Sequence, residues 1–305
     1  MNEYLISVIL GIIEGLTEFL PVSSTAHLRL ASALFDLPLE DPYWKMYSVV
    51  IQLGAVLAVV VYFWPRIVEF LRSFPQGKNG DRTWLTHPLT LVIGAFAVTA
   101  GPAYLLDKTI GENLESLPVI GWSLLIGGIV MWVVDVIWGN RSEHDGAAAS
   151  PTGADVAPPP SARRGRTMDG MTWLQAIFIG AAQILAAAFP GTSRSMATIA
   201  AGQIAGLTRP AALEFSFFLS IPVMFAATGF KLLQAMLGRG GDAGEAYEMT
   251  AHRWGVLAVG FVVSFIVAWG VIAWFMAWVR RHGFVPFAIY RIVLGVIVLI
   301  WAWRG

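Results

Sequence analysis

Residues 6 to 27 read Ile6-Ser-Val-Ile-Leu-Gly-Ile-Ile-Glu-Gly-Leu-Thr-Glu-Phe-Leu20-Pro21-Val-Ser-Ser-Thr-Ala-His27, an apolar stretch that ends in proline and hydroxyl side chains. Glu14 and Glu18 interrupt this stretch at a spacing that places both carboxylates on one face of a helix. An ionisable side chain at the centre of a bilayer costs at least about 2.5–3.5 kcal/mol, so it persists mainly where it serves a site. The stretch therefore predicts a chemically active helix end inside a membrane.

The composition also indicates a membrane protein. Of the 305 residues, 56% are hydrophobic and 13% are charged, and the mean hydropathy is +0.66. The formal net charge is zero, so no basic field would recruit nucleic acid. Cysteine is absent, which excludes disulfides, thiolate catalysis and cysteine-ligated zinc. The start Met1-Asn-Glu-Tyr4 lacks the basic residues of a signal peptide, so we expect the first segment to remain in the mature protein.

Apolar runs long enough to cross a bilayer indicate the main helices. Two other segments are interrupted by proline and polar residues, the first at Pro21 and the second, Met171 to Leu207, at Pro190-Gly-Thr-Ser-Arg-Ser195. A helix, a polar turn and a second helix are typical of a re-entrant hairpin that dips to mid-membrane. Six runs are predicted as transmembrane helices: Tyr47 to Trp64, Pro88 to Leu106, Val119 to Trp138, Phe215 to Leu237, Trp254 to Val279 and Pro286 to Trp303.

The two halves of the sequence repeat each other. Each half contains one hairpin and three crossings, and an odd number of crossings turns the second copy upside down. We therefore expect an all-α polytopic membrane protein with six transmembrane helices and two re-entrant helical hairpins arranged as an inverted repeat. The predicted units are a first repeat at 1–138, a disordered cytoplasmic linker at 139–170 and a second, inverted repeat at 171–305. The matching pairs are Pro21 with Pro190, Ser24 with Ser193 and Glu14 with Gln183 at an offset of 169, and Pro118 with Pro286 and Gly127 with Gly295 at 168.

The charges of the loops predict the orientation of the chain in the membrane. Cytoplasmic loops carry an excess of lysine and arginine. Loops 64–87, 139–172 and 280–281 carry such basic clusters and are predicted to be cytoplasmic. Both termini and the acidic loops are then predicted on the opposite side; the acidic residues are Asp107, Glu112, Glu115, Asp242, Glu245 and Glu248.

Hairpins that enter from opposite faces are expected to meet near the middle of the bilayer. The second tip offers a helix start, hydroxyl groups and the guanidinium of Arg194, which together favour a phosphate. The acids of the first tip would repel that anion unless Glu14 and Glu18 hold a divalent cation or one carboxyl is protonated, and the cation is the simpler solution. The residues expected to converge are Glu14, Glu18, Ser23, Ser24, Thr25 and His27 with Gln183, Thr192, Ser193, Arg194, Ser195 and Thr198.

Two segments resemble a known family. Glu14-Gly-Leu-Thr-Glu-Phe-Leu-Pro-Val-Ser-Ser-Thr-Ala-His27 and Pro190-Gly-Thr-Ser-Arg-Ser-Met-Ala-Thr198 are similar to the signature motifs of the bacitracin-resistance family of undecaprenyl-diphosphate phosphatases. The resemblance covers nearly the whole chain, including Val285 to Arg291, and departs from it at Ala26 and Met196, where glycine is expected. It implies a multi-pass enzyme of the bacterial inner membrane that removes the terminal phosphate of a C55 polyprenyl diphosphate and so recycles the lipid carrier for cell-wall synthesis. It also implies a need for a divalent cation and an active site that opens to the periplasm.

For this reaction we expect Glu14, Glu18, Ser24, His27 and Arg194 to be catalytic. Arg194 and a cation held by Glu14 and Glu18, either Mg²⁺ or Ca²⁺, would bind the diphosphate and stabilise its developing charge. Two routes stay open, namely attack by Ser24 with His27 as the base, or attack by water that His27 or Glu18 activates. The residues expected to bind substrate are Ser23, Thr25, Gln183, Thr192, Ser193, Ser195 and Thr198.

Alternatives exist for the whole chain and for single residues. A polyprenyl-phosphate flippase or another secondary transporter is the rival function, because inverted repeats with broken helices are also a transporter architecture. The hydroxyls of the first tip could serve only as helix caps, and Asp135 and Arg291 are expected to anchor helix ends at the membrane surface. The expected partners are the polyprenyl diphosphate substrate and membrane lipid, without nucleic acid, and a homodimer is left open.

Overall fold

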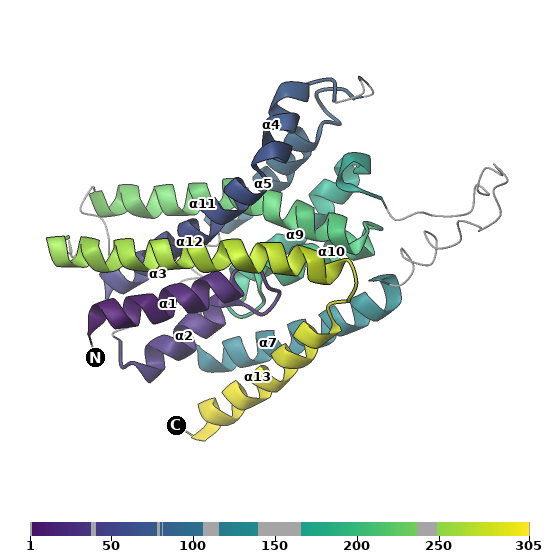
Figure 1. The fold of residues 1–305 in the computed structure, drawn as a ribbon. Coiled ribbons are helices and arrows are strands. Elements are labelled where there is room, and N and C mark those ends of the chain that lie inside the picture. The colour runs from purple at the N-terminus through teal and green to yellow at the C-terminus, as the bar shows by residue number, and fades with distance from the viewer. Residues whose placement is uncertain are drawn as a thin grey trace.

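The structure is a computed structural model whose regular elements are helices throughout the part of the chain that it describes (Figure 1). That part comprises residues 2–37, 41–77, 80, 82–105, 116–139, 166–236 and 249–304. Most of the predicted linker at 139–170 and the acidic loops lie outside these residues. The helices are α1 (Glu3–Thr17), α2 (Ser24–Leu34), α3 (Pro42–Tyr62), α4 (Trp64–Ser73), α5 (Pro88–Leu105), α7 (Leu117–Val134), η1 (Asp135–Gly139), η2 (Met168–Gly170), α9 (Trp173–Ala188), α10 (Arg194–Ile204), α11 (Arg209–Met236), α12 (Ala251–Val279) and α13 (Val285–Arg304).

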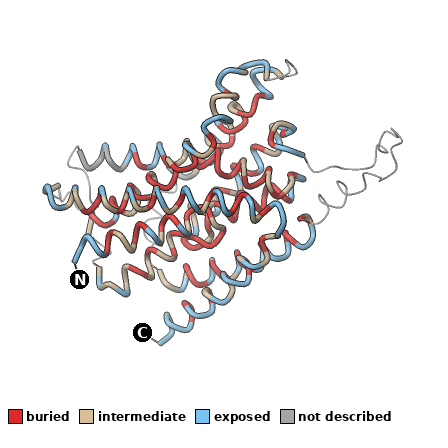
Figure 2. The backbone as a smooth tube through the Cα atoms, in the orientation of Figure 1, coloured by how far each residue is buried: buried red, intermediate tan, exposed pale blue. Residues whose placement is uncertain are grey.

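Several of these helices are suited to a bilayer. Five are long and apolar enough to cross it, namely α3, α7 with η1, α11, α12 and α13, and each coincides with a predicted span. The sixth predicted span corresponds to α5, which counts with α9 among the shorter apolar helices. Large apolar side chains, including Leu174, Ile266 and Trp303, are exposed on the outside of the bundle, whereas buried residues line the helix faces that meet (Figure 2). The chain is therefore an all-helical, multi-pass membrane protein.

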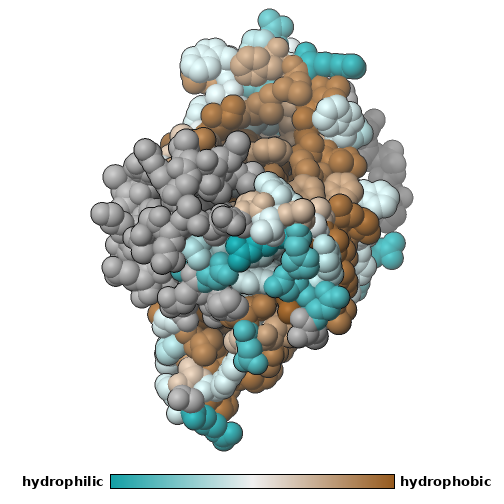
Figure 3. All heavy atoms as spheres, turned by 90° about the vertical axis from the view of Figure 1, so that its left-hand side faces the viewer, coloured by the Kyte–Doolittle hydropathy of each residue, from teal (hydrophilic) through white to brown (hydrophobic). Residues whose placement is uncertain are grey.

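Polar residues are present at the end of the bundle that carries the N-terminus. At the end that carries the N-terminus, hydrophilic side chains gather near the centre of the face, and hydrophobic side chains lie around much of its border (Figure 3). This distribution fits a helical bundle whose sides contact lipid and whose ends contact water.

Each helix hairpin turns at a serine whose backbone is left-handed. Ser23 has a φ of 73° and caps α2 by accepting the Ala26 N–H (3.5 Å). Ser193 has a φ of 70° and caps α10 by accepting the Met196 N–H (3.3 Å). Positive φ is uncommon outside glycine, so this shared conformation identifies the two serines as equivalent. The sequence-based pairing of Ser24 with Ser193 is wrong by one residue, because the second turn has one more residue between its proline and its cap.

The first helix of each hairpin packs against the other half of the chain. Helix α1 lies along α12 and α9 lies along α5, while α7 packs against α13 and α3 against α11. Glycine permits these close approaches, because a Cβ at Gly15 would lie 2.8 Å from the carbonyl oxygen of Ser264, and one at Gly180 would lie 2.5 Å from that of Ala95. The two hairpins are thus held by equivalent contacts in the two halves.

Asp135 does not anchor a helix at the surface, and that expectation is wrong. It is buried and accepts hydrogen bonds from Arg209 Nε (2.8 Å), Gln203 Nε2 (3.0 Å) and the Phe284 N–H (2.7 Å). These partners belong to α11, α10 and the start of α13. One carboxylate therefore connects the end of α7 to three elements of the second half.

Candidate active site

The tips of the two helix hairpins contact each other directly. The turn between α1 and α2 contains Leu20 and Pro21, and the turn between α9 and α10 contains Gly191. Ser195 Oγ, at the start of α10, donates a hydrogen bond to the Leu20 carbonyl oxygen (3.0 Å). The prediction that the two half-sites meet therefore agrees with this contact between residues 175 positions apart in sequence.

Glu18 joins the two tips electrostatically. It caps the C-terminus of α1, and its Oε2 accepts a hydrogen bond from Ser24 Oγ at 2.5 Å. Its Oε1 forms an ion pair with Nη2 of Arg194, the first residue of α10. Both side chains of this ion pair are largely buried, so the surrounding protein screens their attraction little. Three predicted catalytic residues thus form one network of acid, hydroxyl and guanidinium.

Polar atoms without partners surround this network. Glu14 is 0% exposed, and both of its carboxylate oxygens lack a hydrogen-bond partner among the described residues. The same holds for Gln183 Oε1 and for Arg194 Nη1. Buried polar atoms of native proteins are nearly always satisfied, so an unpaired group of this kind requires an explanation such as a bound ion or ligand. An acid, an amide oxygen and a guanidinium N–H are therefore available to a ligand of the site.

His27 lies on α2, and none of the described hydrogen bonds joins its imidazole to Ser24. Its Nδ1 is 2.7 Å from the Ser23 carbonyl oxygen, and its Nε2 is 2.6 Å from the Tyr290 hydroxyl of α13. The imidazole and phenol rings are nearly parallel, with 8° between their planes and 5.7 Å between their centroids. The group that contacts the hydroxyl of Ser24 is Glu18, not His27.

The other residues predicted for the site differ in the hydrogen bonds that their hydroxyl groups form. Ser23 caps α2, as the alternative interpretation of the first tip proposed. Ser193 caps α10, and its Oγ also lies 3.0 Å from Ser195 Oγ. Thr198 Oγ1 points to its own helix and to Ser216 Oγ of α11 (2.7 Å). Thr25 and Thr192 are partly exposed, and none of the described side-chain hydrogen bonds involves them.

Arg291 was expected to be a surface anchor, and that interpretation is wrong. It is 0% exposed and donates three hydrogen bonds, one from Nη1 to the Pro21 carbonyl oxygen (3.2 Å) and two from Nη2 to those of Gly191 (3.0 Å) and Ser123 (3.1 Å). Pro21 belongs to the first hairpin turn, Gly191 to the second, and Ser123 to α7. One guanidinium therefore links both turns to the α7–α13 pair.

Glu14 and Glu18, the predicted ligands of a divalent cation, differ in whether their carboxylate oxygens already have protein partners. Glu14 has two buried oxygens without a hydrogen-bond partner in the described part of the chain, while those of Glu18 are engaged by Ser24 and Arg194. Within the described ranges, no three His, Cys, Asp or Glu side chains gather into a metal-binding group. Mg²⁺ is commonly bound by one or two carboxylates together with substrate phosphates and water, so Glu14 fits this mode of binding, and Glu18 would join it on releasing Ser24 or Arg194.

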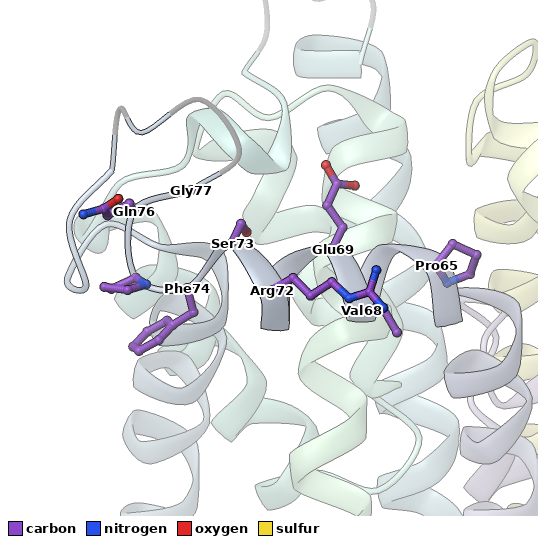
Figure 4. A pocket seen from close by; sticks show the side chains of 9 residues that line it. Pro65, Val68, Glu69, Arg72, Ser73, Phe74, Gln76 and Gly77 are labelled. Carbon is purple, nitrogen blue, oxygen red and sulfur yellow. The ribbon is translucent and has the colours of Figure 1, made fainter.

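A surface cavity of about 570 Å³ lies elsewhere, along α4 and the residues that follow it (Figure 4). Its charged lining residues are Glu69 and Arg72. None of the residues predicted for the active site belongs to this cavity. The convergence of the hairpin tips, rather than the presence of a hollow, therefore defines the candidate site.

The sequence was compared with known proteins. The family described as bacitracin resistance protein BacA matches residues 7–297. A protein named undecaprenyl-diphosphatase from Koribacter versatilis is 55% identical over 305 residues, which cover 99% of each chain. The chain belongs to the BacA family. Two further proteins named undecaprenyl-diphosphatase, from Rhizobium etli (strain CIAT 652) and Caldanaerobacter subterraneus, are each 38% identical, over 99% and 95% of this chain and 98% and 93% of their own.

Two residues of this BacA family member were missed by sequence reasoning. Tyr290 and Arg291 lie in the segment Val285 to Arg291, which contributed to the resemblance but was given no role in the active site. A signal was available, because Arg291 is the seventh residue of α13 and lies almost two turns inside an apolar helix. An arginine at that depth usually has a buried partner or a function.

Proposed function

We propose that this chain is an integral membrane undecaprenyl-diphosphate phosphatase, which hydrolyses undecaprenyl diphosphate to undecaprenyl phosphate and inorganic phosphate. Its relatives of 55% and 38% identity carry the name undecaprenyl-diphosphatase. The observation that carries the proposal is the network of Glu18, Ser24 and Arg194 across the two hairpin tips. Such a network places an activated hydroxyl beside a guanidinium, which suits phosphoryl transfer more than the passage of a solute.

The proposed architecture is six transmembrane helices with two re-entrant hairpins in an inverted repeat, in the bacterial inner membrane. Equivalent packing of α1 on α12 and of α9 on α5 supports the repeat. The basic loops at 64–87 and 280–281 support a cytoplasmic position for that end of the bundle. Under this orientation the first hairpin enters from the periplasmic side, and the site opens to the periplasm.

In the proposed mechanism, Arg194 binds the diphosphate. Its Nη1 has no partner among the described residues, and its Nη2 pairs with Glu18. Glu14 and Glu18 would hold a divalent cation, which supplies charge neutralisation to the phosphates when it is bound. The hydroxyls of Thr25 and Thr192, which take part in none of the described side-chain hydrogen bonds, and the amide N–H of Gln183 would donate to phosphate oxygens.

Glu18 is the residue placed to remove a proton from Ser24. Attack of Ser24 Oγ on the terminal phosphorus would transfer the hydroxyl proton to Glu18 Oε2, 2.5 Å away, and break the anhydride bond to release undecaprenyl phosphate. Water would then hydrolyse the phosphoserine to inorganic phosphate. In the second route water attacks the phosphorus directly, and Ser24 serves as a hydrogen-bond donor to the substrate.

The test of the function is phosphate release from undecaprenyl diphosphate by the purified protein in detergent with Mg²⁺ or Ca²⁺. We expect turnover by the wild type and a loss of at least about 100-fold, or about 2.7 kcal/mol, in Arg194→Ala. Arg72→Ala is the matched control, because Arg72 lines the separate cavity on α4, and it should keep wild-type turnover. If the wild type releases no phosphate with any divalent cation but moves the lipid across vesicle membranes, the chain is a transporter.

A further inference from the structure

The hydrogen bonds of His27 determine which of its nitrogen atoms can act as a base. A backbone carbonyl only accepts, so the contact of 2.7 Å to Ser23 places a proton on Nδ1. In the neutral imidazole the lone pair then lies on Nε2. That atom faces the hydroxyl of Tyr290 at 2.6 Å and not the hydroxyl of Ser24.

We propose that Tyr290 is a positioning residue that holds the imidazole of His27 in one orientation in the proposed phosphatase, where His27 is a candidate base for the attacking water. Its hydroxyl donates to Nε2 of the neutral imidazole, and after a rotation it accepts from Nε2–H of the imidazolium. One phenol can therefore stabilise both charge states in the same ring orientation. The nearly parallel rings, 8° apart, restrict rotation of the imidazole and add to this hold.

This pair joins α2 of the first half to α13 of the second half, and it has no counterpart between the repeat-related helices α10 and α7. If Ser23 and Ser193 are equivalent, the residue of α10 that corresponds to His27 is Ala197. The offset of 168 between α7 and α13 makes Trp122 the residue that corresponds to Tyr290. Neither replacement can form the hydrogen bond between an imidazole and a phenol. The pair therefore involves only the hairpin that also carries Glu14 and Glu18, as expected of a functional pair and not of a general packing contact.

The backbone of Tyr290 is held in place by its neighbour. Arg291 donates to the carbonyl groups of both hairpin turns, so α13 cannot move independently of the turn that precedes α2. The distance between Tyr290 and His27 is therefore maintained by two successive residues of one helix. The side chain of Tyr290 is 46% exposed, so replacing it by phenylalanine opens no buried cavity.

The first experiment is a double-mutant cycle. Phosphate release is measured for the wild type, Tyr290→Phe, His27→Ala and the double variant. We expect Tyr290→Phe to lower kcat about tenfold, or about 1.4 kcal/mol, with KM within about twofold. In the His27→Ala background the same change should lower kcat less than about twofold, because Tyr290 acts only through His27. An equal loss in both backgrounds would overturn the proposal.

The second experiment does not depend on turnover. Diethylpyrocarbonate acylates an unprotonated imidazole nitrogen, and mass spectrometry of the peptide that contains His27 reports the rate. We expect Tyr290→Phe to accelerate labelling of His27 at least threefold, because Nε2 loses its hydroxyl partner. Tyr4→Phe is the matched control, since Tyr4 contacts His252 edge to face outside the site with 5.1 Å between ring centroids, and it should leave His27 labelling unchanged.

The two experiments separate the inference from the function on which it rests. A wild-type protein that releases no phosphate refutes the phosphatase, while the labelling rates still decide whether Tyr290 protects His27. Unchanged labelling of His27 in Tyr290→Phe would overturn the proposal even in an active enzyme.

Discussion

Replacement of Arg291 tests whether the two hairpin turns are fastened by one guanidinium. Arg291 donates three hydrogen bonds, at 3.0, 3.1 and 3.2 Å. Hydrogen bonds to charged groups are each worth about 1.5–3 kcal/mol, so Arg291→Met removes about 4.5–9 kcal/mol of interaction. Arg291→Met also removes a fully buried charge that pairs with no carboxylate among the described residues. Because the desolvation cost of that charge disappears, the folded state regains several kcal/mol of stability. We expect a net loss of about 2–4 kcal/mol in the free energy of unfolding.

The effect on turnover should be larger than the effect on stability. The turns carry the residues that flank Ser24 and Arg194, and a misplacement of about 1 Å can cost about 100-fold in rate. We therefore expect kcat for phosphate release to fall about 100-fold in Arg291→Met. Arg291→Lys keeps the charge but not the planar fork, so it should recover only a small part of this loss.

The distance between the hairpins can be measured directly, because the chain contains no cysteine. Spin labels at Leu16→Cys on α1 and Phe189→Cys beside the second turn occupy exposed positions. Double electron–electron resonance should give a narrow distance distribution in the wild-type background and a broader one with Arg291→Met. An unchanged distribution together with kcat within twofold of wild type would refute the role of Arg291. Full activity in Arg291→Lys would show that only its charge matters.

Three further predictions concern the nucleophile, the cation and the cluster at the end of α7. Ser24→Ala should abolish nearly all phosphate release if a phosphoserine forms, whereas activity within about tenfold of wild type, or about 1.4 kcal/mol of barrier, would favour direct attack by water. Chelation should stop turnover reversibly, and Glu14→Gln should raise the Mg²⁺ concentration for half-maximal rate; a turnover indifferent to chelator would exclude the cation. Asp135→Asn should lower the free energy of unfolding by about 3–5 kcal/mol, because the buried Arg209 loses its carboxylate. Thermal unfolding in detergent checks this last value, with the exposed Glu3→Gln as a control that should change it by less than about 1 kcal/mol.

Local signals predicted most of the helices. Apolar runs and their prolines located the five long helices and both hairpins, because helix formation and membrane length depend on contiguous sequence. The register of the repeat was wrong by one residue at the turns, because a turn can absorb an insertion without altering the helices beside it. The conformation of Ser23 and Ser193, and not the identity of their neighbours, reveals which residues correspond.

The structure brings several of the predicted site residues together, but some of them contact other partners than the sequence suggested. Sequence brought Glu18, Ser24 and Arg194 to one region, and the structure joins them in one network. The expected partner of Ser24 was His27, since the two residues lie three positions apart on one helix face. The partner is instead Glu18, because the imidazole is drawn to Tyr290 of another helix.

The sequence by itself determined that an acid pair lies in an apolar helix, that an arginine lies at an equivalent turn, and that both must be buried together. These facts follow from spacing and from the cost of placing charge in lipid. Only the tertiary structure decided that Glu18 accepts a hydrogen bond from Ser24 and forms an ion pair with Arg194. It also decided that Arg291 donates hydrogen bonds to both hairpin turns. Apart from the Glu18–Ser24 hydrogen bond, these contacts join residues at least 100 positions apart, and their geometry depends on how distant helices pack, which local sequence does not encode.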